Sequence, residues 1–293
     1  MRESVHERAC ERLESLVLAI RGTTLTSNRT GADLAALATR LRLKTLGALY
    51  AAGSGHIGAS LSMAELVAVL YFDEMTLEGE DRDRFVLSKG HAVPMLYAAF
   101  AELGWISEDE LRSLRQLNSR LQGHPDMTRL PCLDAGTGAL GQGASIAIGY
   151  ALAARLRSSP ARSYCILGDG ETQEGQIWEA AMYASSAKLE NLCLIIDANG
   201  LQNETWVADT LPIEPLADKW TSFGWRVSAI DGHDIDAIRV AFGEARETKE
   251  RPTLILARTV KGKGVPFMEN DSAWHGKQLQ EAEYRAAVEA LSA

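Results

Sequence analysis

Two turns that carry oxygen-bearing side chains follow two short apolar runs in the middle of the chain. Asp169 lies in a Gly-Asp-Gly turn directly after the run Tyr164–Leu167, and Asn199 lies just after the run Leu192–Ile196, thirty residues further on. Short continuous apolar runs are typical of buried parallel strands, whose carboxyl ends form the edge of the sheet where open α/β proteins bind ligands. We therefore expect Asp169 and Asn199 to share one hard cation.

The segment between the two runs is predicted to be a helix. Residues 171–190 are rich in Ala and Glu, and Ile177, Ala181 and Ala184 recur at helical spacing. A strand, a glycine-rich turn and a helix in this order favour an anion at the turn, because the free N–H groups and the helix dipole point there. A carboxylate beside a phosphate requires a metal ion between them, so the unit indicates a Mg²⁺-bridged diphosphate. A Gly-Asp-Gly sequence alone is more often a bare tight turn.

The whole unit resembles the thiamine diphosphate motif of transketolases, in which a Gly-Asp-Gly turn is followed about thirty residues later by Asn. The stretch GDGETQEG through DANGLQ is similar to the transketolase version almost residue by residue. The resemblance implies that Mg²⁺ is held by Asp169, Asn199 and the backbone carbonyl of Leu201, with diphosphate oxygens and a water completing the octahedron. It also implies that Gly168 and Gly170 let the backbone approach the diphosphate.

Five of the six histidines stand beside a glycine, which suggests loops that bring the backbone close to a ligand. A single histidine is more often a hydrogen-bonded structural residue. Four of the five, however, lie in segments that resemble transketolase segments, namely SGHIG, KGHA, QGHP and WHGK. These four predicted site histidines are His56, His91, His124 and His275. The fifth, His233 in DGHD, is expected to occupy a strand-end turn without a catalytic part, and His6 to be solvated.

The resemblance to transketolases also implies tasks for the site histidines. Transketolases move a two-carbon ketol unit from a ketose to an aldose, so hydroxyl protons must leave and return, and imidazole titrates near working pH. By resemblance, His124 would hydrogen-bond the ketol hydroxyl, and His56 and His275 would move protons on donor and acceptor oxygens. His91 would line the site close to the cofactor diphosphate, and His275 would also contact the cofactor.

A third glycine-rich segment, residues 137–143, precedes a helix of small residues at 144–156. Glycines in such a loop supply positive φ angles and backbone donors, although many loops of this kind bind nothing. The segment resembles the TGPLGQG loop through which transketolases contact the cofactor, with Ala139 in place of the usual Pro or Ser. The resemblance implies that Gly138 and Gly141 bind the cofactor.

The remaining pattern predicts one α/β domain. Further strands are predicted at Arg84–Leu87, Val227–Ile230 and Thr253–Val260. They alternate with helical segments such as Leu61–Phe72, which indicates a doubly wound, largely parallel sheet with helices on both faces. The resemblance implies that this is the thiamine diphosphate-binding fold. We expect a single domain over residues 31–293 and, before it, an amino-terminal helical extension at residues 1–30.

The length of the chain bears on how an active site could be completed. The resemblance runs from about Leu41 to about Lys277 and corresponds only to the amino-terminal half of a whole transketolase. That family also needs a pyrimidine-binding domain, whose glutamate helps to deprotonate the cofactor, and none is recognisable in the 293 residues. Either a separate carboxy-terminal subunit supplies it, or the sequence is a fragment. The helix expected after WHGKQLQ favours a natural subunit, in an α2β2 assembly that acts on sugars or sugar phosphates.

Two other functions stay open. One is the alpha chain of a 2-oxo acid dehydrogenase, which also binds thiamine diphosphate as half of a heterotetramer, and the four histidine segments disfavour it. The other is a non-catalytic partner that binds the cofactor or another chain, and the intact Asp169 and Asn199 disfavour that. The sequence does not determine the donor and acceptor sugars.

Composition disfavours several other classes. A net charge of −9 and a pI near 5.3 argue against a nucleic-acid partner. Neither a signal peptide nor a membrane-spanning segment is recognisable, and the four cysteines show no metal-binding spacing. Together these features predict a cytoplasmic protein.

Local composition also predicts roles for residues near the motifs. Glu171 and Glu174 are expected to stabilise the positive end of a helix dipole. Lys261 and Lys263, in KGKG, are expected to lie in a mobile, solvated turn that flanks the site. Trp206 stands where many transketolases have a different stretch and could narrow the entrance. We therefore hypothesise that Trp206→Ala changes sugar preference more than cofactor affinity.

Overall fold

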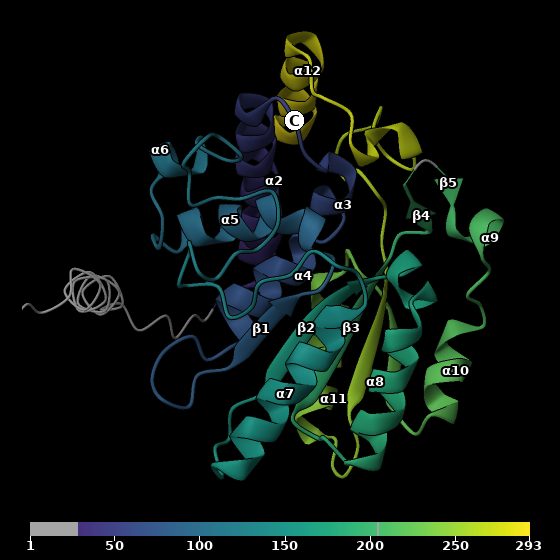
Figure 1. Cartoon of the computed structure of the whole chain (residues 1–293). Helices are drawn as coiled ribbons and strands as arrows, with labels where there is room; N and C mark the ends of the chain where they lie inside the picture. Colours follow the sequence, from purple (N-terminus) through teal and green to yellow (C-terminus); the bar gives the residue numbers. More distant parts are fainter. Residues whose placement is uncertain (1–28, 204) are drawn as a thin grey trace, which may run out of the picture.

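The sheet at the centre of the fold is parallel throughout. In the computed structural model, which describes residues 29–203 and 205–293, its strands are β1 (Arg84–Leu87), β2 (Ser163–Gly168), β3 (Leu192–Ala198), β6 (Arg226–Asp231) and β7 (Thr253–Arg258). They lie in the order β1-β2-β3-β7-β6, and every neighbouring pair is parallel (Figure 1). The five predicted strand positions are confirmed, although the last predicted strand ends early, at Arg258.

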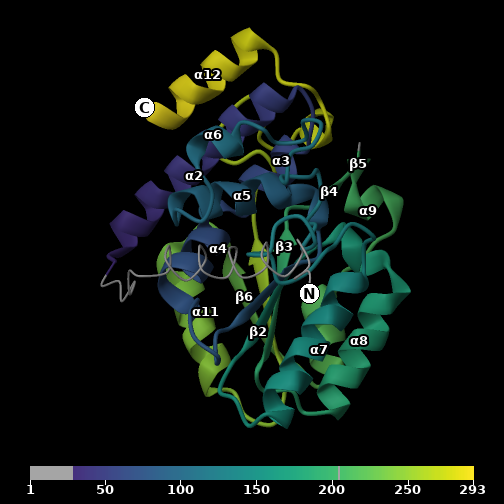
Figure 2. The same cartoon turned by 60° about the vertical axis from the view of Figure 1, so that its left-hand side comes forward.

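Helices cover both faces of the sheet because the chain changes direction as it crosses it. The steps from β1 to β2 and from β2 to β3 run one way and carry α7 (Gln142–Leu156) and α8 (Gly175–Ser186), whereas the step from β6 to β7 runs the other way and carries α11 (Ile235–Glu247). Since crossovers between parallel strands are right-handed, the reversal puts α11 on the opposite face. Figure 2 shows α7 and α8 on one side of the strands and α11 on the other. The predicted doubly wound α/β fold is confirmed.

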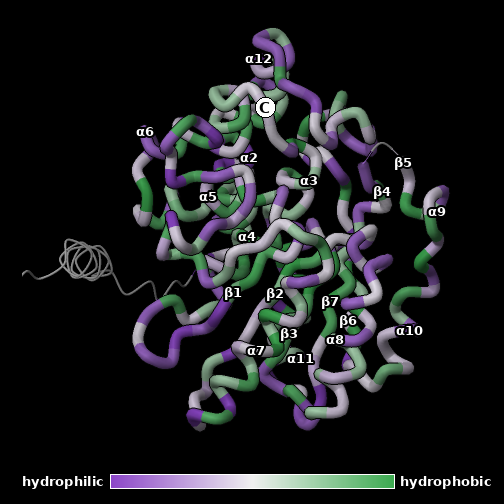
Figure 3. Tube along the Cα trace, viewed as in Figure 1, coloured by the Kyte–Doolittle hydropathy of each residue, from purple (hydrophilic) through white to green (hydrophobic). Residues whose placement is uncertain are grey.

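Successive strand residues enter two separate apolar cores. Cys165 and Leu194 pack with α7 and α8, while their neighbours Ile166 and Cys193 pack into the larger core on the other face. Side chains of a strand alternate between the faces of a sheet, so a strand covered on both faces must be apolar throughout. Figure 3 shows this as green, hydrophobic stretches along the central strands, with purple, hydrophilic stretches mostly in the outer loops. The thiols of Cys165 and Cys193 are free and buried, as expected for small apolar groups.

Figure 1 shows α2 (Gly31–Ala52), α3 (Ile57–Leu61), α5 (Val93–Glu102) and α12 (Glu281–Ser292) at the end of the molecule that lies beyond the carboxyl ends of the strands. The remaining helices are α4 (Ala64–Val69), α6 (Glu108–Leu111), α9 (Val207–Thr210) and α10 (Leu216–Ser222). A π-helical turn, η1 (Leu70–Glu74), follows α4, and short 3-10 turns are η2 (Gly90–Ala92), η3 (Gly170–Gln173) and η4 (Ser272–His275). No helix in the described part of the chain has both the length and the apolarity needed to cross a bilayer.

One predicted helix is wrong in its extent. The segment Leu61–Phe72 is not continuous, because α3 ends at Leu61, α4 begins at Ala64, and the last turn is π-helical. Ser62 lies in the break, where its hydroxyl donates to the carboxylate of Asp197 at 2.6 Å. The apolar pattern predicted helix correctly but could not show this long-range contact.

The predicted amino-terminal extension falls almost wholly outside the described residues. Of residues 1–30 the structure describes only Arg29 and Thr30. Thr30 caps α2, because its side chain accepts from the N–H of Asp33 while the Asp33 side chain accepts from the N–H of Thr30. The main domain therefore begins with a defined helix start, and the extension stays a prediction.

Candidate functional site

The predicted site residues gather in one cavity at the carboxyl ends of β2 and β3. In the sheet register Gly168 pairs with Asp197, so the two turns that follow these residues lie side by side. The cavity has a volume of about 370 Å³, and every predicted site residue except Gly141 lines it. Gly141 caps the start of α7 with a φ of 83°, one residue after Leu140, which does line the cavity.

The Gly200 peptide connects the three predicted metal ligands, because it lies between Asn199 and Leu201 and donates to Asp169. Asp169 is 4% exposed, and its carboxylate accepts from the N–H of Gly170 at 2.8 Å and from the N–H of Gly200 at 2.5 Å. The side-chain oxygen of Asn199 accepts from the N–H of Leu201 at 3.1 Å. Because Gly200 lies between Asn199 and Leu201, its hydrogen bond ties the Asp169 carboxylate to the segment that carries the other two predicted oxygen ligands, and all three residues line the same cavity.

This set fits a hydrated magnesium ion. Burial, together with the nearby carboxylate of Asp197, raises the pKa of Asp169 to about 6. A buried carboxylate that faces a second carboxylate is stabilised in its charged form by a divalent cation, and oxygen atoms of carboxylate, amide and carbonyl groups are the ligands that Mg²⁺ accepts. The chemistry of the donors therefore agrees with the predicted metal, although the roles of the individual ligands stay a proposal.

The four site histidines form a cluster of rings above the metal-ligand set. The ring centroid of His56 lies 5.0 Å from that of His91, 5.1 Å from that of His275 and 6.4 Å from that of His124. These rings come from four separate segments of the chain. One nitrogen, Nδ1 of His56, is buried without a hydrogen-bond partner among the described residues, which is expected where a ligand supplies the partner.

Burial and neighbouring cations keep this histidine cluster uncharged. Burial, with help from nearby cationic side chains, lowers the pKa of His56 and of His275 to about 4 and that of His91 to about 2. Burial and the guanidinium of Arg115 also lower the pKa of His124. A neutral imidazole offers one donor and one acceptor, so each ring can both give and receive a hydrogen bond at neutral pH.

The neutral state of the cluster leads to a prediction for the unliganded chain. A group whose folded pKa lies below its ordinary value binds its proton only at lower pH, so His56 and His275 are expected to stay neutral from pH 8 down to pH 6. Their ring proton resonances in NMR spectra should hold constant over that interval and move as the pH falls toward 4. His56→Gln and His275→Gln variants assign the two signals. A midpoint near pH 6.5 for either ring would contradict the burial argument.

Lys261 corrects the prediction of a solvated KGKG turn. The residue is 1% exposed, and its ammonium lies 3.1 Å from Nδ1 of His275 and 3.4 Å from the carbonyl oxygen of Leu201. Burial, with the charge of Lys89 nearby, lowers the pKa of Lys261 to about 8. The local composition of two lysines among glycines misled the prediction, because the glycines allow the backbone to fold Lys261 into the site. Lys263, by contrast, is half-buried.

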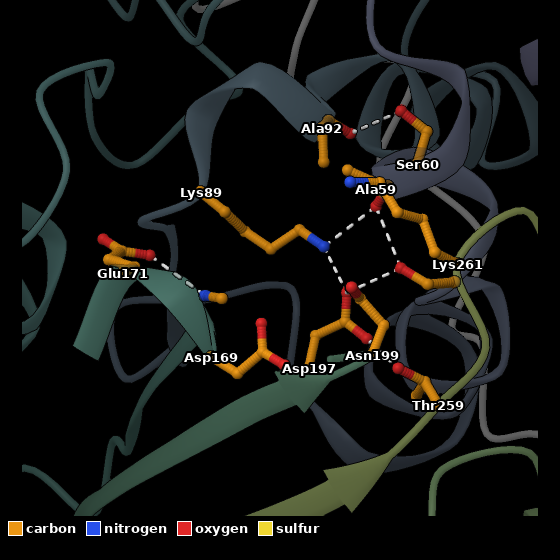
Figure 4. Close-up of polar contacts among 12 residues, drawn as sticks. Ala59, Ser60, Lys89, Ala92, Asp169, Glu171, Asp197, Asn199, Thr259 and Lys261 are labelled. Carbon is orange, nitrogen blue, oxygen red and sulfur yellow. Dashed lines mark hydrogen bonds and ion pairs between the residues drawn. The ribbon is translucent and has the colours of Figure 1, made fainter. Parts of the chain in front are cut away.

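A second lysine, Lys89, also lines the cavity and was missed by sequence reasoning. It is 1% exposed, donates to the carbonyl of Ala59 at 2.9 Å and pairs with the fully buried carboxylate of Asp197. Figure 4 shows Lys89 and Lys261 approaching the carboxyl edge of the sheet from opposite sides. A glycine follows Lys89 and Lys261, but one also follows Lys263, which does not line the cavity, so this signal alone does not identify the site lysines.

Asp197 accepts hydrogen bonds from four side chains that come from separate parts of the chain. Its carboxylate accepts from Ser62, Lys89 and Thr259, and from the amide of Asn199 at 3.3 Å. Burial alone would raise the pKa of this carboxyl group, but the Lys89 ammonium and the hydrogen bonds hold it below its ordinary value. The ionised Asp197 thereby fixes the amide of Asn199, so that its oxygen is left for Leu201 or a metal ion.

Glu171 corrects a second prediction. It was expected to act on a helix dipole, but its carboxylate is buried and accepts from the N–H of Gly141 at 2.8 Å, from the N–H of Gly168 at 3.0 Å and from the hydroxyl of Ser88. Burial raises the pKa of this group. Glu171 therefore holds two of the predicted cofactor-binding glycines at a fixed separation.

His233 has a structural place, as expected. Its Nδ1–H donates to the carboxylate of Glu65 at 3.0 Å, and its Nε2 accepts from the N–H of Val260 at 2.9 Å. Glu65 is held in turn by Arg42 in a buried bidentate pair. Both ring nitrogens form hydrogen bonds within the protein, so His233 fixes the position of the turn that leads into Lys261.

Comparisons with known proteins show the family to which the chain is similar. The family described as "Transketolase, thiamine diphosphate binding domain" matches residues 34–292. A 6-deoxy-6-sulfo-D-fructose transketolase subunit, SqwG, from Clostridium sp. (strain MSTE9) is 43% identical over 264 residues, covering 88% of this chain and 96% of that protein. Transketolase-like protein 2 from Homo sapiens is 42% identical over 264 residues, which are 87% of this chain but only 41% of the human protein.

Solved structures give the same result at the level of the fold. A transketolase from Campylobacter jejuni superposes with a TM-score of 0.82 at 33% identity, covering 88% of this chain and 42% of the other. A transketolase from Leishmania mexicana gives 0.81 at 29% identity and covers 41% of that chain. The chain therefore spans about two fifths of the length of these transketolases and nearly all of the clostridial subunit.

Proposed function

Because this chain belongs to the transketolase family, whose thiamine diphosphate-binding domain matches residues 34–292, we propose that it is the amino-terminal subunit of a two-component transketolase. It would bind thiamine diphosphate and Mg²⁺ and transfer a two-carbon ketol unit from a ketose to an aldose. The observation that carries the proposal is one cavity that brings together the oxygen atoms of Asp169, Asn199 and Leu201 with a cluster of neutral imidazoles. That cluster and the family match favour this function over that of a 2-oxo acid dehydrogenase.

The cofactor would be held at its charged end by this chain. Asp169, Asn199 and the carbonyl of Leu201 would bind Mg²⁺, while the backbone at Gly168 and Gly170 would lie along the diphosphate. Gly138 and Gly141, from the loop before α7, would approach it from the other side, where the buried Glu171 keeps Gly141 and Gly168 apart. When bound, thiamine diphosphate supplies the carbon nucleophile and electron sink that cleavage beside a ketose carbonyl requires.

The imidazoles would handle the protons of the sugar hydroxyls. His56, which lines the cavity and whose Nδ1 has no partner in the described part of the protein, would exchange a hydrogen bond with a substrate hydroxyl. His124 would hold the ketol hydroxyl, and His275 would exchange protons with an oxygen of the acceptor. The ammonium of Lys261, 3.1 Å from Nδ1 of His275, would orient that ring so that its other nitrogen faces the cavity. His91, the most strongly shifted of the rings, would line the diphosphate side.

A partner subunit would complete the site. Large apolar side chains stand exposed around the cavity. Leu140 lines it and is 39% exposed, Met127 lines a neighbouring groove and is 47% exposed, and Trp206, which pairs with the cavity residue Leu201, is 46% exposed. Exposed apolar side chains around a binding site are typical of a surface that another chain covers. The clostridial relative, of which this chain covers 96%, is itself named as a subunit. We infer that a carboxy-terminal subunit with the pyrimidine-binding domain docks here, in an α2β2 assembly.

The relative's name also suggests a substrate class. That protein is named for 6-deoxy-6-sulfo-D-fructose, a ketose with a sulfonate at carbon 6. We propose that the donor of the present enzyme is a ketose whose far end carries an anion, either sulfonate or phosphate. The two differ in charge at neutral pH, since a phosphate monoester carries close to two negative charges and a sulfonate carries one.

The proposal predicts turnover only when both chains are present. The chain is to be co-expressed with the product of the gene adjacent to its own, and assayed with thiamine diphosphate and Mg²⁺ using 6-deoxy-6-sulfo-D-fructose and fructose 6-phosphate as donors. We expect ketol transfer to an aldose from the pair of chains and none from either chain alone. Activity of this chain alone would refute the two-component arrangement, and inactivity of the pair with every donor and acceptor tested would refute the function.

A further inference from the structure

A small antiparallel sheet of β4 (Leu201–Gln202) and β5 (Thr205–Trp206) begins at Leu201, one of the three predicted metal ligands. Leu201 pairs with Trp206 and Gln202 pairs with Thr205. This pairing places Trp206 beside Leu201, the first residue of β4. The ring is 46% exposed, so about half of its surface is covered by the protein.

One edge of the Trp206 ring lies beside Gly200. A Cβ atom placed on Gly200 would meet Cζ3 of Trp206 at 3.2 Å and Cε3 at 3.4 Å, so the ring edge fills the space that a side chain at this position would need. Gly200 has a φ of 78°, a left-handed conformation that glycine adopts readily but that also leaves it free to adopt others. The indole edge therefore lies against the glycine that separates Asn199 from Leu201.

The same glycine is held by hydrogen bonds on both sides. Its N–H donates to the carboxylate of Asp169 at 2.5 Å, and its carbonyl accepts from the N–H of Val207 at 2.8 Å. Val207 directly follows Trp206, so the ring contact and the second hydrogen bond come from one short segment. Movement of that segment would shift the Gly200 peptide and, with it, the neighbouring ligands Asn199 and Leu201 relative to Asp169.

We propose that Trp206 is a positioning residue for the divalent cation: by packing on Gly200 it fixes the spacing between Asp169, Asn199 and the Leu201 carbonyl. The inference rests on the proposed function, because it takes these three groups as the Mg²⁺ ligands. Groups that orient metal ligands without touching the metal typically change metal affinity by about 10- to 100-fold when they are removed. The geometry thus favours a larger effect of Trp206 on Mg²⁺ affinity than on sugar preference. The sequence-based hypothesis expected the larger effect on sugar preference.

The test measures metal binding apart from turnover. The full chain, co-purified with its carboxy-terminal subunit and saturated with thiamine diphosphate, is titrated with Mg²⁺ by calorimetry. We expect Trp206→Ala to weaken Mg²⁺ binding about 10-fold and Trp206→Phe, which keeps a flat ring over Gly200, to bind nearly as the parent does. The KM for the ketose should change less than the Mg²⁺ dissociation constant. Leu211→Ala is the matched control, since Leu211 is 54% exposed just beyond the same segment and does not contact Gly200.

Three results would refute the inference. One is unchanged Mg²⁺ affinity in Trp206→Ala with a raised ketose KM, which would restore the sugar-preference hypothesis. Another is an affinity loss in Trp206→Phe as large as in Trp206→Ala. The third is a weakened affinity accompanied by a large fall in the melting temperature of the metal-free protein, which would show general loss of structure. Failure of the parent protein to take up Mg²⁺ and thiamine diphosphate would instead contradict the proposed function.

Discussion

Replacing Asp169 with alanine is expected to abolish retention of thiamine diphosphate and Mg²⁺. Asp169 supplies the charged oxygen ligand of the predicted set, and its carboxylate also accepts the N–H of Gly200 that fixes the other two ligands. The loss should therefore exceed the roughly 10- to 100-fold reduction in affinity that follows removal of a group that only orients a ligand. Calorimetric titration of cofactor and Mg²⁺ into the full chain with its partner subunit measures the effect.

Asp169→Asn separates the two contributions of this side chain. The amide keeps an oxygen that can accept from Gly200 but removes the negative charge that attracts the cation. We expect its cofactor affinity to lie between those of the parent and Asp169→Ala. Undiminished uptake by Asp169→Ala would show that the cation, or the diphosphate itself, is bound elsewhere.

Replacing Lys89 with methionine is expected to give the largest loss of stability. Lys89 and Asp197 form an ion pair in which the side chains are 2% and 0% exposed, so the substitution leaves a buried carboxylate without its cation. Breaking a buried pair by removing one partner costs about 3–5 kcal/mol of unfolding free energy. Urea unfolding followed by far-ultraviolet circular dichroism measures the change.

Two further variants distinguish pairing from other effects of the Lys89 change. In the double variant Lys89→Met, Asp197→Asn, neither member of this pair carries a charge. The combined loss of stability should therefore be smaller than the sum of the two single losses. Lys249→Met is the control for a lysine whose pair is exposed, because Lys249 lies 3.4 Å from Glu190 with side chains 68% and 42% exposed. Its removal should cost about 0–1 kcal/mol. A Lys89→Met effect in that same range would mean that water or another residue compensates Asp197.

The predictable parts of the molecule were those that local pattern determines. The strands at Tyr164–Leu167 and Leu192–Ile196 were identified because strands covered on both faces must be continuously apolar. Their carboxyl ends adjoin in a parallel sheet, and this placed Asp169 beside Asn199 without knowledge of the rest of the fold. Resemblance to transketolases then added the histidines, which the structure brings together although they are more than two hundred residues apart at the extremes, His56 and His275.

The residues that were misjudged are those whose surroundings come from distant segments. Lys261 was assigned to solvent because its neighbours are polar and small, yet its side chain enters a cavity formed by α3, β3 and the β4 segment. Glu171 stands in the first turn of a helical segment, where an exposed position was the natural expectation. Its burial depends on Ser88 and Gly141, which lie 83 and 30 residues away. Neither contact leaves a signal in the local sequence.

The difference in burial among the tryptophans has a consequence for the intrinsic fluorescence of the protein. Trp220 and Trp225 are 0% and 2% exposed, with ring centroids 4.8 Å apart, and the indole N–H of Trp225 donates to the carbonyl of Ala181. All six tryptophans lie in the described part of the chain, and among them only Trp206 is exposed. Because indole emits at longer wavelength in water than in an apolar core, the red edge of the fluorescence spectrum should report mainly on Trp206. Arrival of a ligand beside Gly200, or of a second chain over the mouth, could then be followed without any added dye.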